Sequence, residues 1–239
     1  MAVGSKSFPA RPVFDTAISP LPTDKNPSLR HTSRPAIWLQ VAVAYLLIQA
    51  TLWTMPPTYH NFLMALATVA ILLFTLIGGY SRHQMGLTSP RLNSTLRILA
   101  LGLIPAAALP FAAMLLGQPV PATPSWPSLY GMWEYAIWAT VQQFILQSFF
   151  FIRLESLLDG RRAVWAAAVL FSAAHIPNPV LTVGTFLGAL FFCEMFRRYR
   201  TIYPLGIAHA ACGLALAESV PQSLLRHMRV GIAYIHFLH

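Results

Sequence analysis

Apolar residues fall in long, nearly continuous runs along this chain, separated by short polar or proline-rich loops. Runs of about 20 apolar residues are long enough to cross a bilayer as helices. The pattern predicts helices at approximately 36–55, 61–80, 94–116, 132–158, 162–175, 180–197 and 203–218, followed by a mixed segment at 224–239. The short alternating segments of a transmembrane β-barrel do not occur. We therefore predict an all-α fold, a polytopic transmembrane bundle of seven to eight helices.

Composition and charge agree with a membrane location. Hydrophobic residues make up 56% of the chain and charged residues only 10%, whereas roughly a quarter of the residues of a soluble domain are charged. The net charge of +9 would favour nucleic-acid binding in a soluble protein. Here, however, the Lys and Arg residues flank the apolar runs, as they do in cytoplasmic loops. We expect membrane lipids as partners and no nucleic acid.

The chain divides into a polar N-terminal segment and one membrane domain. Residues 1–35 are rich in Pro, Ser and basic residues and lack the apolar run of a signal peptide, so they predict a disordered basic cytoplasmic tail. Residues 36–239 predict a single membrane-embedded domain with its core at 132–218.

Loop charges predict the orientation. Lys and Arg occur in alternate loops only, which favours a cytoplasmic N-terminus. Arg226 and Arg229 disagree, because after seven spans they would lie outside. The C-terminal segment therefore either returns as an eighth helix or lies along a membrane surface.

Five polar side chains lie inside apolar runs and mark a candidate site. Gln142, Gln143 and Gln147 belong to the fourth predicted helix, and Gln143 and Gln147 share one face because they are four residues apart. Glutamines at this depth either hydrogen-bond between helices or line a polar pocket. His175 ends the fifth predicted helix and His209 lies in the seventh; imidazole can act as acid, base, oxyanion donor or metal ligand.

The predicted helices place the two histidines at different depths in the membrane. At about 1.5 Å per residue, His175 lies ~20 Å from the start of its predicted helix, but His209 only ~9 Å from Tyr203 at the same membrane face. The helices must tilt, or the seventh must begin earlier, for the imidazoles to meet.

The charged residues near the helix ends have structural interpretations. Glu194 and Arg198 are spaced for an ion pair on one helix face. Arg153 and Glu155 are expected to extend toward the membrane interface, where their charges stay hydrated.

The cysteines and histidines do not predict a metal centre. Cys193 and Cys212 are expected to be small buried hydrophobic residues, in preference to a Cys212–His209 nucleophile–base pair. Zinc is the metal that histidines would most readily suggest, but two histidines without a nearby carboxylate or thiolate fall short of the three protein ligands of catalytic zinc. We therefore predict no metal and no cofactor.

Residues 141–216 resemble the CPBP (Abi) family of intramembrane endopeptidases, which includes the type II CAAX prenyl proteases. The first motif of the family, Glu-Glu followed by three residues and Arg, is here Gln142-Gln143 followed by Gln147. The second, Phe-x-x-x-His, is Phe171 to His175. The third, His-x-x-x-Asn, reads His209 to Gly213.

The resemblance implies a set of site residues. The positions that would be catalytic are His175, His209, Gln142 and Gln143, and those that would bind are Gln147, Phe171 and Gly213. In the family a glutamate activates water. A neutral amide cannot act as a general base, a contribution typically worth about 10² to 10⁴ in rate. The loss of the arginine is consistent with this change, because a buried Arg without a carboxylate would be costly in a membrane.

Three hypotheses follow from the resemblance and its departures. The first is a CPBP-family intramembrane endopeptidase with a variant active site, acting on a membrane-protein or peptide substrate. The second is a catalytically inactive pseudoprotease that binds a membrane peptide, lipid or partner helix, and the third is a membrane scaffold. The resemblance also implies a multi-pass protein of the bacterial inner membrane.

Overall fold

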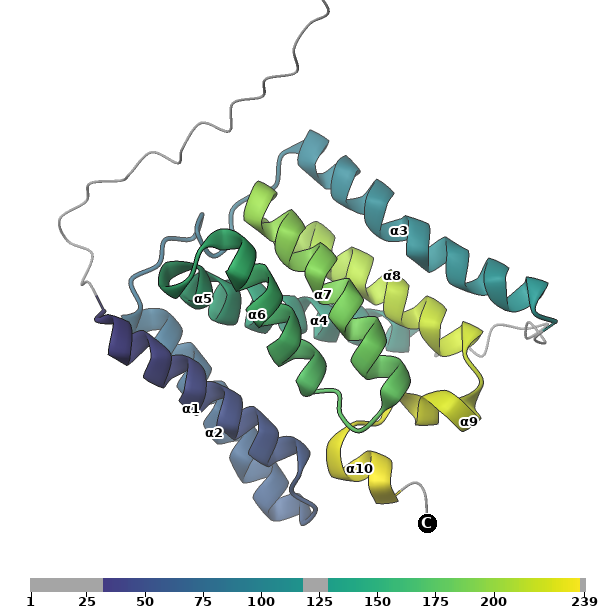
Figure 1. Ribbon diagram of the computed structural model, residues 1–239, viewed down its shortest axis with the longest axis horizontal. Helices are drawn as coiled ribbons and strands as arrows, with labels where there is room; N and C mark the ends of the chain where they lie inside the picture. The colour runs from purple at the N-terminus through teal and green to yellow at the C-terminus, as the bar shows by residue number, and fades with distance from the viewer. Residues whose placement is uncertain (1–31, 118–128, 237–239) are drawn as a thin grey trace, which may run out of the picture.

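The computed structural model describes residues 32–117 and 129–236, and every regular element within them is a helix (Figure 1). The elements of the bundle are α1 (Arg34–Leu52), α2 (Pro57–Ile77), α3 (Leu92–Leu115), α4 (Leu129–Gln143), η1 (Phe144–Phe151), α5 (Ile152–Leu157), α6 (Gly160–Ala173), α7 (Pro179–Tyr199) and α8 (Tyr203–Ser219). The short α9 (Gln222–Leu225), η2 (Arg226–Met228) and α10 (Gly231–His236) follow. The predicted helical bundle is confirmed, whereas the predicted tail lies almost entirely outside the described residues.

The helix that carries the glutamines is the centre of the bundle. Elements α4, η1 and α5 form one continuous rod, and every residue from Leu146 to Leu154 is buried. A helix segment that is buried on all sides lies in the interior of the bundle, and its polar residues Gln147, Ser148 and Arg153 need partners there. The sequence predicted an ordinary α-helix here, but Phe144–Phe151 is a π-helix. Its wider i→i+5 turn is rare and occurs frequently at functional sites.

The other helices surround this rod in pairs. Helix α1 packs on α2, α6 on α7, and α8 on both α3 and α4; α3 lies along the edge of the bundle beside α8 (Figure 1). Most large apolar side chains of α2 and α3 are exposed, as Leu76 of α2 is at 78%. In water such a surface would be costly, but it suits contact with lipid chains.

Five helices are long and apolar enough to cross a membrane: Arg34–Leu52, Pro57–Ile77, Leu92–Leu115, Gly131–Leu157 and Pro179–Tyr199. The protein is therefore a multi-pass integral membrane protein. Helices α6 and α8, with 14 and 17 residues, extend only about 21 and 26 Å. Both are shorter than the ~30 Å hydrocarbon core, so their partners must shield their ends.

One end of the bundle is closed by ion pairs and a folded loop. Glu194 pairs with Arg197 and with Arg198, which confirms the predicted i,i+4 pair, and Glu155 pairs with Arg200. The loop between α2 and α3 folds back onto the bundle, where Gly86 has a φ of +71° and an added Cβ would meet the Phe196 ring at 2.5 Å. Only glycine fits this position, for both conformational and steric reasons.

The C-terminal segment lies at the opposite end of the bundle. Its contacts show whether it crosses the membrane again as an eighth helix or lies along the surface. The side chain of Asn178 caps α7 at Leu181, and its Nδ2 donates to the carbonyl oxygens of Leu225 and Arg229 at 2.8 and 3.1 Å. The amide of Gly231 donates to the carbonyl of Ile176 at 2.9 Å. The described part of this segment thus lies against the turn that follows α6, and does not return through the bundle.

The prediction that Arg153 extends toward the membrane interface is wrong, because its side chain points into the bundle. Its side chain is fully buried, with Nε 2.9 Å from Oε1 of Gln40 and Nη2 2.6 Å from the carbonyl oxygen of Phe74. The guanidinium also lies 4.0 Å from the centroid of the Phe149 ring. It joins the central rod to α1 and α2, because a carbonyl, an amide and an aromatic face replace water around the charge.

Candidate functional site

Gln143 lies at the middle of the membrane-spanning rod and starts a chain of hydrogen bonds. It is twelve residues from the start of the Gly131–Leu157 span and fourteen from its end, so it lies about 18 to 21 Å from each. Its side chain is fully buried. Oε1 of Gln143 accepts from Nε2 of Gln147 at 3.2 Å, and its Nε2 lies 3.2 Å from Nδ1 of His209. The predicted shared face of the two glutamines therefore points at a predicted histidine.

Two aromatic rings hold the His209 imidazole. The ring centroids of Phe171 and Phe192 lie 6.1 and 5.4 Å from that of His209. Phe171 comes from α6 and Phe192 from α7, so three helices converge on one half-buried imidazole of α8. Such packing limits the rotation of the ring and keeps Nδ1 facing Gln143.

Phe171 also contacts the second histidine. Its ring centroid lies 4.9 Å from that of His175, and its carbonyl oxygen lies 2.7 Å from Nδ1 of His175. His175 is not in the helix but in the turn after α6, while α8 begins at Tyr203 as predicted. The two imidazoles are thus brought to one aromatic residue, because one of them lies in a turn and the short helices need not cross the whole bilayer.

With the amides oriented as they are in the structure, the hydrogen bonds assign a tautomer to each imidazole. A carbonyl oxygen only accepts, so Nδ1 of His175 must donate to Phe171, and Nε2 of the neutral ring is then an acceptor. The amide nitrogen of Gln143 only donates, so Nδ1 of His209 accepts, and its Nε2 carries the proton. The free ring nitrogens are therefore a base on His175 and a donor on His209.

Gln147 is buried behind this network. Its Nε2 donates to Gln143, whereas its Oε1 has no hydrogen-bond partner among the described residues. The fully buried Cys193 interacts with the Gln147 side chain. Gln147 therefore orients Gln143, and the predicted burial of Cys193 is confirmed.

Gln142 is not brought into this cluster. Its side chain is half-buried and makes no hydrogen bond to any described residue, although the sequence placed it beside Gln143 in the candidate site. Adjacent residues of a helix point about 100° apart, and the face of Gln143 is the one that meets α8.

Tyr135 is a site residue that the sequence motifs did not identify. A Cβ atom built on Gly213 would overlap the Tyr135 hydroxyl oxygen and would lie 2.9 Å from Cζ. Gly213 thus leaves the space that Tyr135 fills, one helical turn from His209. The signal was present in the sequence, because Tyr135, Ala139, Gln143 and Gln147 recur at every fourth position and so share a helix face.

Among the described residues, no carboxylate pairs with this cluster and no metal-ligand group is present. Glu155 and Glu194 pair with arginines at the other end of the bundle, and neither imidazole pairs with a carboxylate in the described chain. Residues 32–117 and 129–236 contain no group of three or more His, Cys, Asp or Glu side chains arranged to hold a metal ion. The chemistry available from these side chains is that of imidazole, amide and phenol groups.

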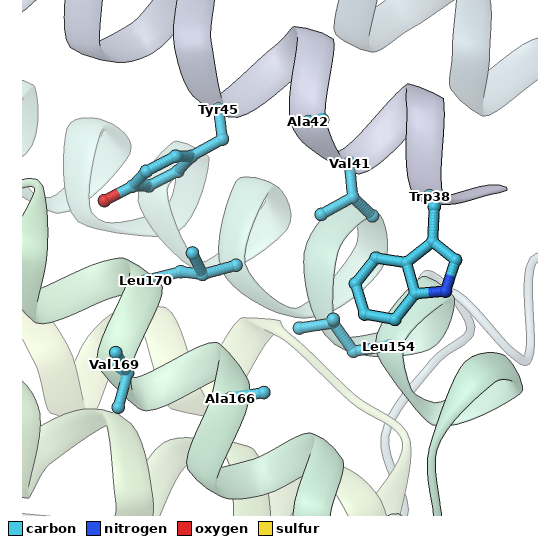
Figure 2. A pocket seen from close by; sticks show the side chains of 8 residues that line it. All are labelled: Trp38, Val41, Ala42, Tyr45, Leu154, Ala166, Val169 and Leu170. Carbon is cyan, nitrogen blue, oxygen red and sulfur yellow. The ribbon is translucent and has the colours of Figure 1, made fainter. Parts of the chain in front are cut away.

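An apolar groove of about 390 Å³ lies on the opposite side of α6. Trp38, Val41, Ala42 and Tyr45 of α1 face Ala166, Val169 and Leu170 of α6, with Leu154 between the helices (Figure 2). The only polar side-chain groups in its lining are the Tyr45 hydroxyl and the Trp38 indole nitrogen, so it has no acid, base or nucleophile of the kind found in the histidine cluster. The reactive groups therefore lie in the histidine cluster and not in this groove.

Comparison with known proteins identifies one stretch of the chain. Residues 124–215 match the family model for type II CAAX prenyl endopeptidases, Rce1-like. This stretch contains Tyr135, the glutamine network, both histidines and Gly213. No curated protein and no solved structure matches the chain.

Proposed function

Because residues 124–215 carry a type II CAAX prenyl endopeptidase domain of the Rce1-like kind, which belongs to the CPBP group of membrane proteases, we propose that this protein is an intramembrane endopeptidase. Its variant site keeps the two histidines of the family motifs and has glutamines where those motifs have two glutamates and an arginine. The observation that carries the proposal is the arrangement of the two imidazoles, one held through Nδ1 by the Phe171 carbonyl and the other through Nδ1 by the Gln143 amide.

His175 has the role of the general base. Its Nε2 removes a proton from water as the water oxygen forms a bond to the carbonyl carbon of the scissile peptide. When the tetrahedral intermediate collapses, the C–N bond breaks and His175 returns the proton to the leaving amine. A positioned base of this kind contributes about 10² to 10⁴ in rate. Because the imidazolium has no carboxylate partner in the described chain, we expect slower turnover than a glutamate-based site would give.

His209 has the role of the oxyanion donor. Its Nε2–H is the group that a developing negative charge on the carbonyl oxygen needs, and Gln143 and Gln147 hold the ring in this tautomer. A preorganised donor of this type is typically worth about 10² to 10³ in kcat. Gln143 and Gln147 are positioning residues in this scheme, and Phe171 supports both imidazoles.

The depth of the site suggests the class of substrate. Gln143 lies near the middle of the span, so a scissile bond must enter the membrane domain to reach the cluster. A membrane-protein segment or a lipid-modified peptide meets this requirement. The substrate class is therefore a membrane-associated peptide.

A cleavage assay on the purified full chain tests this function. Fluorescence-quenched peptides, including transmembrane segments and a farnesylated C-terminal peptide, are incubated with the wild type, His175→Ala and the triple variant Gln142→Glu/Gln143→Glu/Gln147→Arg. We expect wild-type cleavage that His175→Ala abolishes. Cleavage by the triple variant alone would instead show that the natural site is inactive.

A pseudoprotease is the second candidate, and one observation favours it. Neither imidazole has a carboxylate partner among the described residues, and Gln142 is not connected to the cluster. The same pocket could then bind a membrane peptide, lipid or partner helix without cleaving it. Binding of a quenched peptide to wild type without any product, with cleavage restored by the triple variant, is the outcome that would establish this role.

The distribution of charge supports a cytoplasmic N-terminus, and the family resemblance is the reason for proposing a bacterial inner membrane. The end that holds the α2–α3 loop also holds Arg197, Arg198 and Arg200, as the positive-inside rule requires of a cytoplasmic face. Arg226 and Arg229 lie at the other end and oppose this assignment. Labelling of single introduced cysteines at Ser89 and Ser223 with a membrane-impermeant reagent in whole bacterial cells tests it. Labelling at Ser223 alone is expected.

A further inference from the structure

A second polar cavity lies at the start of α3, on the rim of the membrane domain. It has a volume of about 320 Å³ and is lined by Arg91, Leu92, Asn93, Ser94 and Arg97 of this helix start and by Tyr199 at the end of α7. It lies at the end of the bundle opposite the C-terminal segment, and none of its lining residues belongs to the histidine cluster.

The side chains of the two arginines in this cavity have no partner among the residues that the structure describes. Both are exposed, and neither guanidinium makes a hydrogen bond, ion pair or ring contact with the described part of the chain. The carboxylates nearby are already occupied, because Glu194 binds Arg197 and Arg198, and Glu155 binds Arg200. The cavity therefore presents two positive charges that no described carboxylate neutralises, together with the hydroxyl groups of Ser94 and Tyr199.

The position of the cavity on α3 matches the level of lipid headgroups. Arg91 precedes the first residue of the span, and Arg97 lies six residues further on, which is about 9 Å along the axis. The headgroup layer on each side of a bilayer is roughly 5 to 8 Å thick. Leu92 and Leu96, at 71% and 57% exposure, place apolar surface beside the arginines.

We propose that this cavity binds the headgroup phosphate of an anionic phospholipid, with the acyl chains of the lipid along the exposed leucines of α3. Guanidinium groups form paired hydrogen bonds with phosphate oxygens, and the hydroxyl groups supply further donors. A soluble acidic peptide fits less well, because it would have to cover the exposed leucines at membrane level. The proposal does not depend on the catalytic function.

A lipid titration of the purified full chain in neutral detergent tests the site. Phosphatidylglycerol and phosphatidylcholine are added separately, and binding is followed by native mass spectrometry and by the thermal midpoint. The variant is Arg91→Gln/Arg97→Gln. The matched control is Arg82→Gln, which removes an exposed arginine of the neighbouring loop that does not line the cavity.

We expect phosphatidylglycerol to bind to the wild type and to the control more tightly than phosphatidylcholine does. The double variant should lose about 5-fold in affinity per arginine, roughly 25-fold in all, from the typical contribution of a basic residue near an anionic membrane surface. Equal binding of phosphatidylglycerol to the double variant, or equal binding of both lipids to the wild type, would overturn the proposal.

Two further measurements keep the test decisive. Inorganic phosphate at matched concentration should not raise the thermal midpoint; if it reproduces the effect of the lipid, the cavity is a site for free anions and the lipid assignment is wrong. If the double variant is poorly folded by size-exclusion chromatography, Arg91→Lys/Arg97→Lys replaces it. The lysine variant should bind more weakly than the wild type because it cannot pair with phosphate oxygens, and unchanged affinity would contradict the guanidinium contacts.

Discussion

The hydroxyl group of Tyr135 occupies the space that a side chain at Gly213 would need, since a Cβ added to the glycine would overlap the hydroxyl oxygen and lie only 2.9 Å from Cζ. We therefore expect Gly213→Ala to lower the thermal midpoint, because overpacking a core typically costs about 1 to 3 kcal/mol. Gly184→Ala is the matched control, since a Cβ there meets nothing closer than 4.0 Å. Adding Tyr135→Phe to Gly213→Ala removes the hydroxyl oxygen and should recover part of the lost thermal stability. If Gly213→Ala alone leaves the thermal midpoint unchanged, α4 and α8 can move apart without cost.

The two neighbouring glutamines should differ sharply in their effect on activity. Gln143→Leu removes the hydrogen bond to His209, whereas Gln142→Leu removes none to a described residue. Loss of a buried hydrogen bond costs about 1 to 3 kcal/mol, which corresponds to roughly 5- to 150-fold in kcat/KM. We expect this loss for Gln143→Leu and little change for Gln142→Leu in the quenched-peptide assay. The reverse order would place the reaction at Gln142.

Arg153 should contribute to stability through the groups that surround it. Arg153→Met leaves the buried Oε1 of Gln40 without its donor and removes one of the two hydrogen bonds to the Phe74 carbonyl, which keeps the bond from the Gly78 amide. An unpaired buried group costs about 1 to 3 kcal/mol. A large drop in the thermal midpoint is expected, with part of it recovered by adding Gln40→Leu. Arg198→Met, at a site with 54% side-chain exposure, should change the midpoint little. Equal effects of the two arginine variants would contradict the anchoring role.

Asn178 should have two separable roles, which two substitutions can distinguish. Asn178→Asp keeps the oxygen that caps α7 but loses the donor to Leu225 and Arg229, and Asn178→Ala loses both. Both variants should expose residues 222–236 to hydrogen exchange, and only the alanine variant should also lose the cap, worth about 0.5 to 2 kcal/mol. Unaltered exchange in both would mean that other contacts hold the C-terminal segment.

Asp159 should introduce a pH dependence at the start of α6. Its carboxylate accepts from the amides of Arg161 and Arg162, and the hydrogen bond from Arg162, with the nearby arginine charges, lowers its pKa below the ordinary value. Because the folded pKa is depressed, its stabilising contribution is present above the unfolded pKa and is lost as the pH falls through the folded one. Asp159→Asn keeps a capping oxygen, so its thermal midpoint should fall less between about pH 6 and about pH 3 than that of the wild type. Equal falls in the two proteins would show that another group causes the acid sensitivity.

The sequence by itself determined the helices and the location of the candidate site. Long apolar runs require a helical backbone in a membrane, because only helices and closed barrels satisfy their own hydrogen bonds there. The i,i+4 spacing of Gln143 and Gln147, and of Glu194 and Arg198, fixed which side chains share a face. Such local periodicity can be read from the sequence, since it needs no knowledge of what the helix packs against.

Only the tertiary structure decided which polar groups meet. The contact of Gln143 with His209, the position of Phe171 between both imidazoles and the exclusion of Gln142 all depend on the register between helices. The burial of Arg153 and the fit of Tyr135 against Gly213 depend on the same register. That register results from side chains that are distant in the sequence and pack around the π-helical turn at Phe144–Phe151. The periodicity of a single helix does not predict it, because periodicity does not depend on how neighbouring helices are aligned.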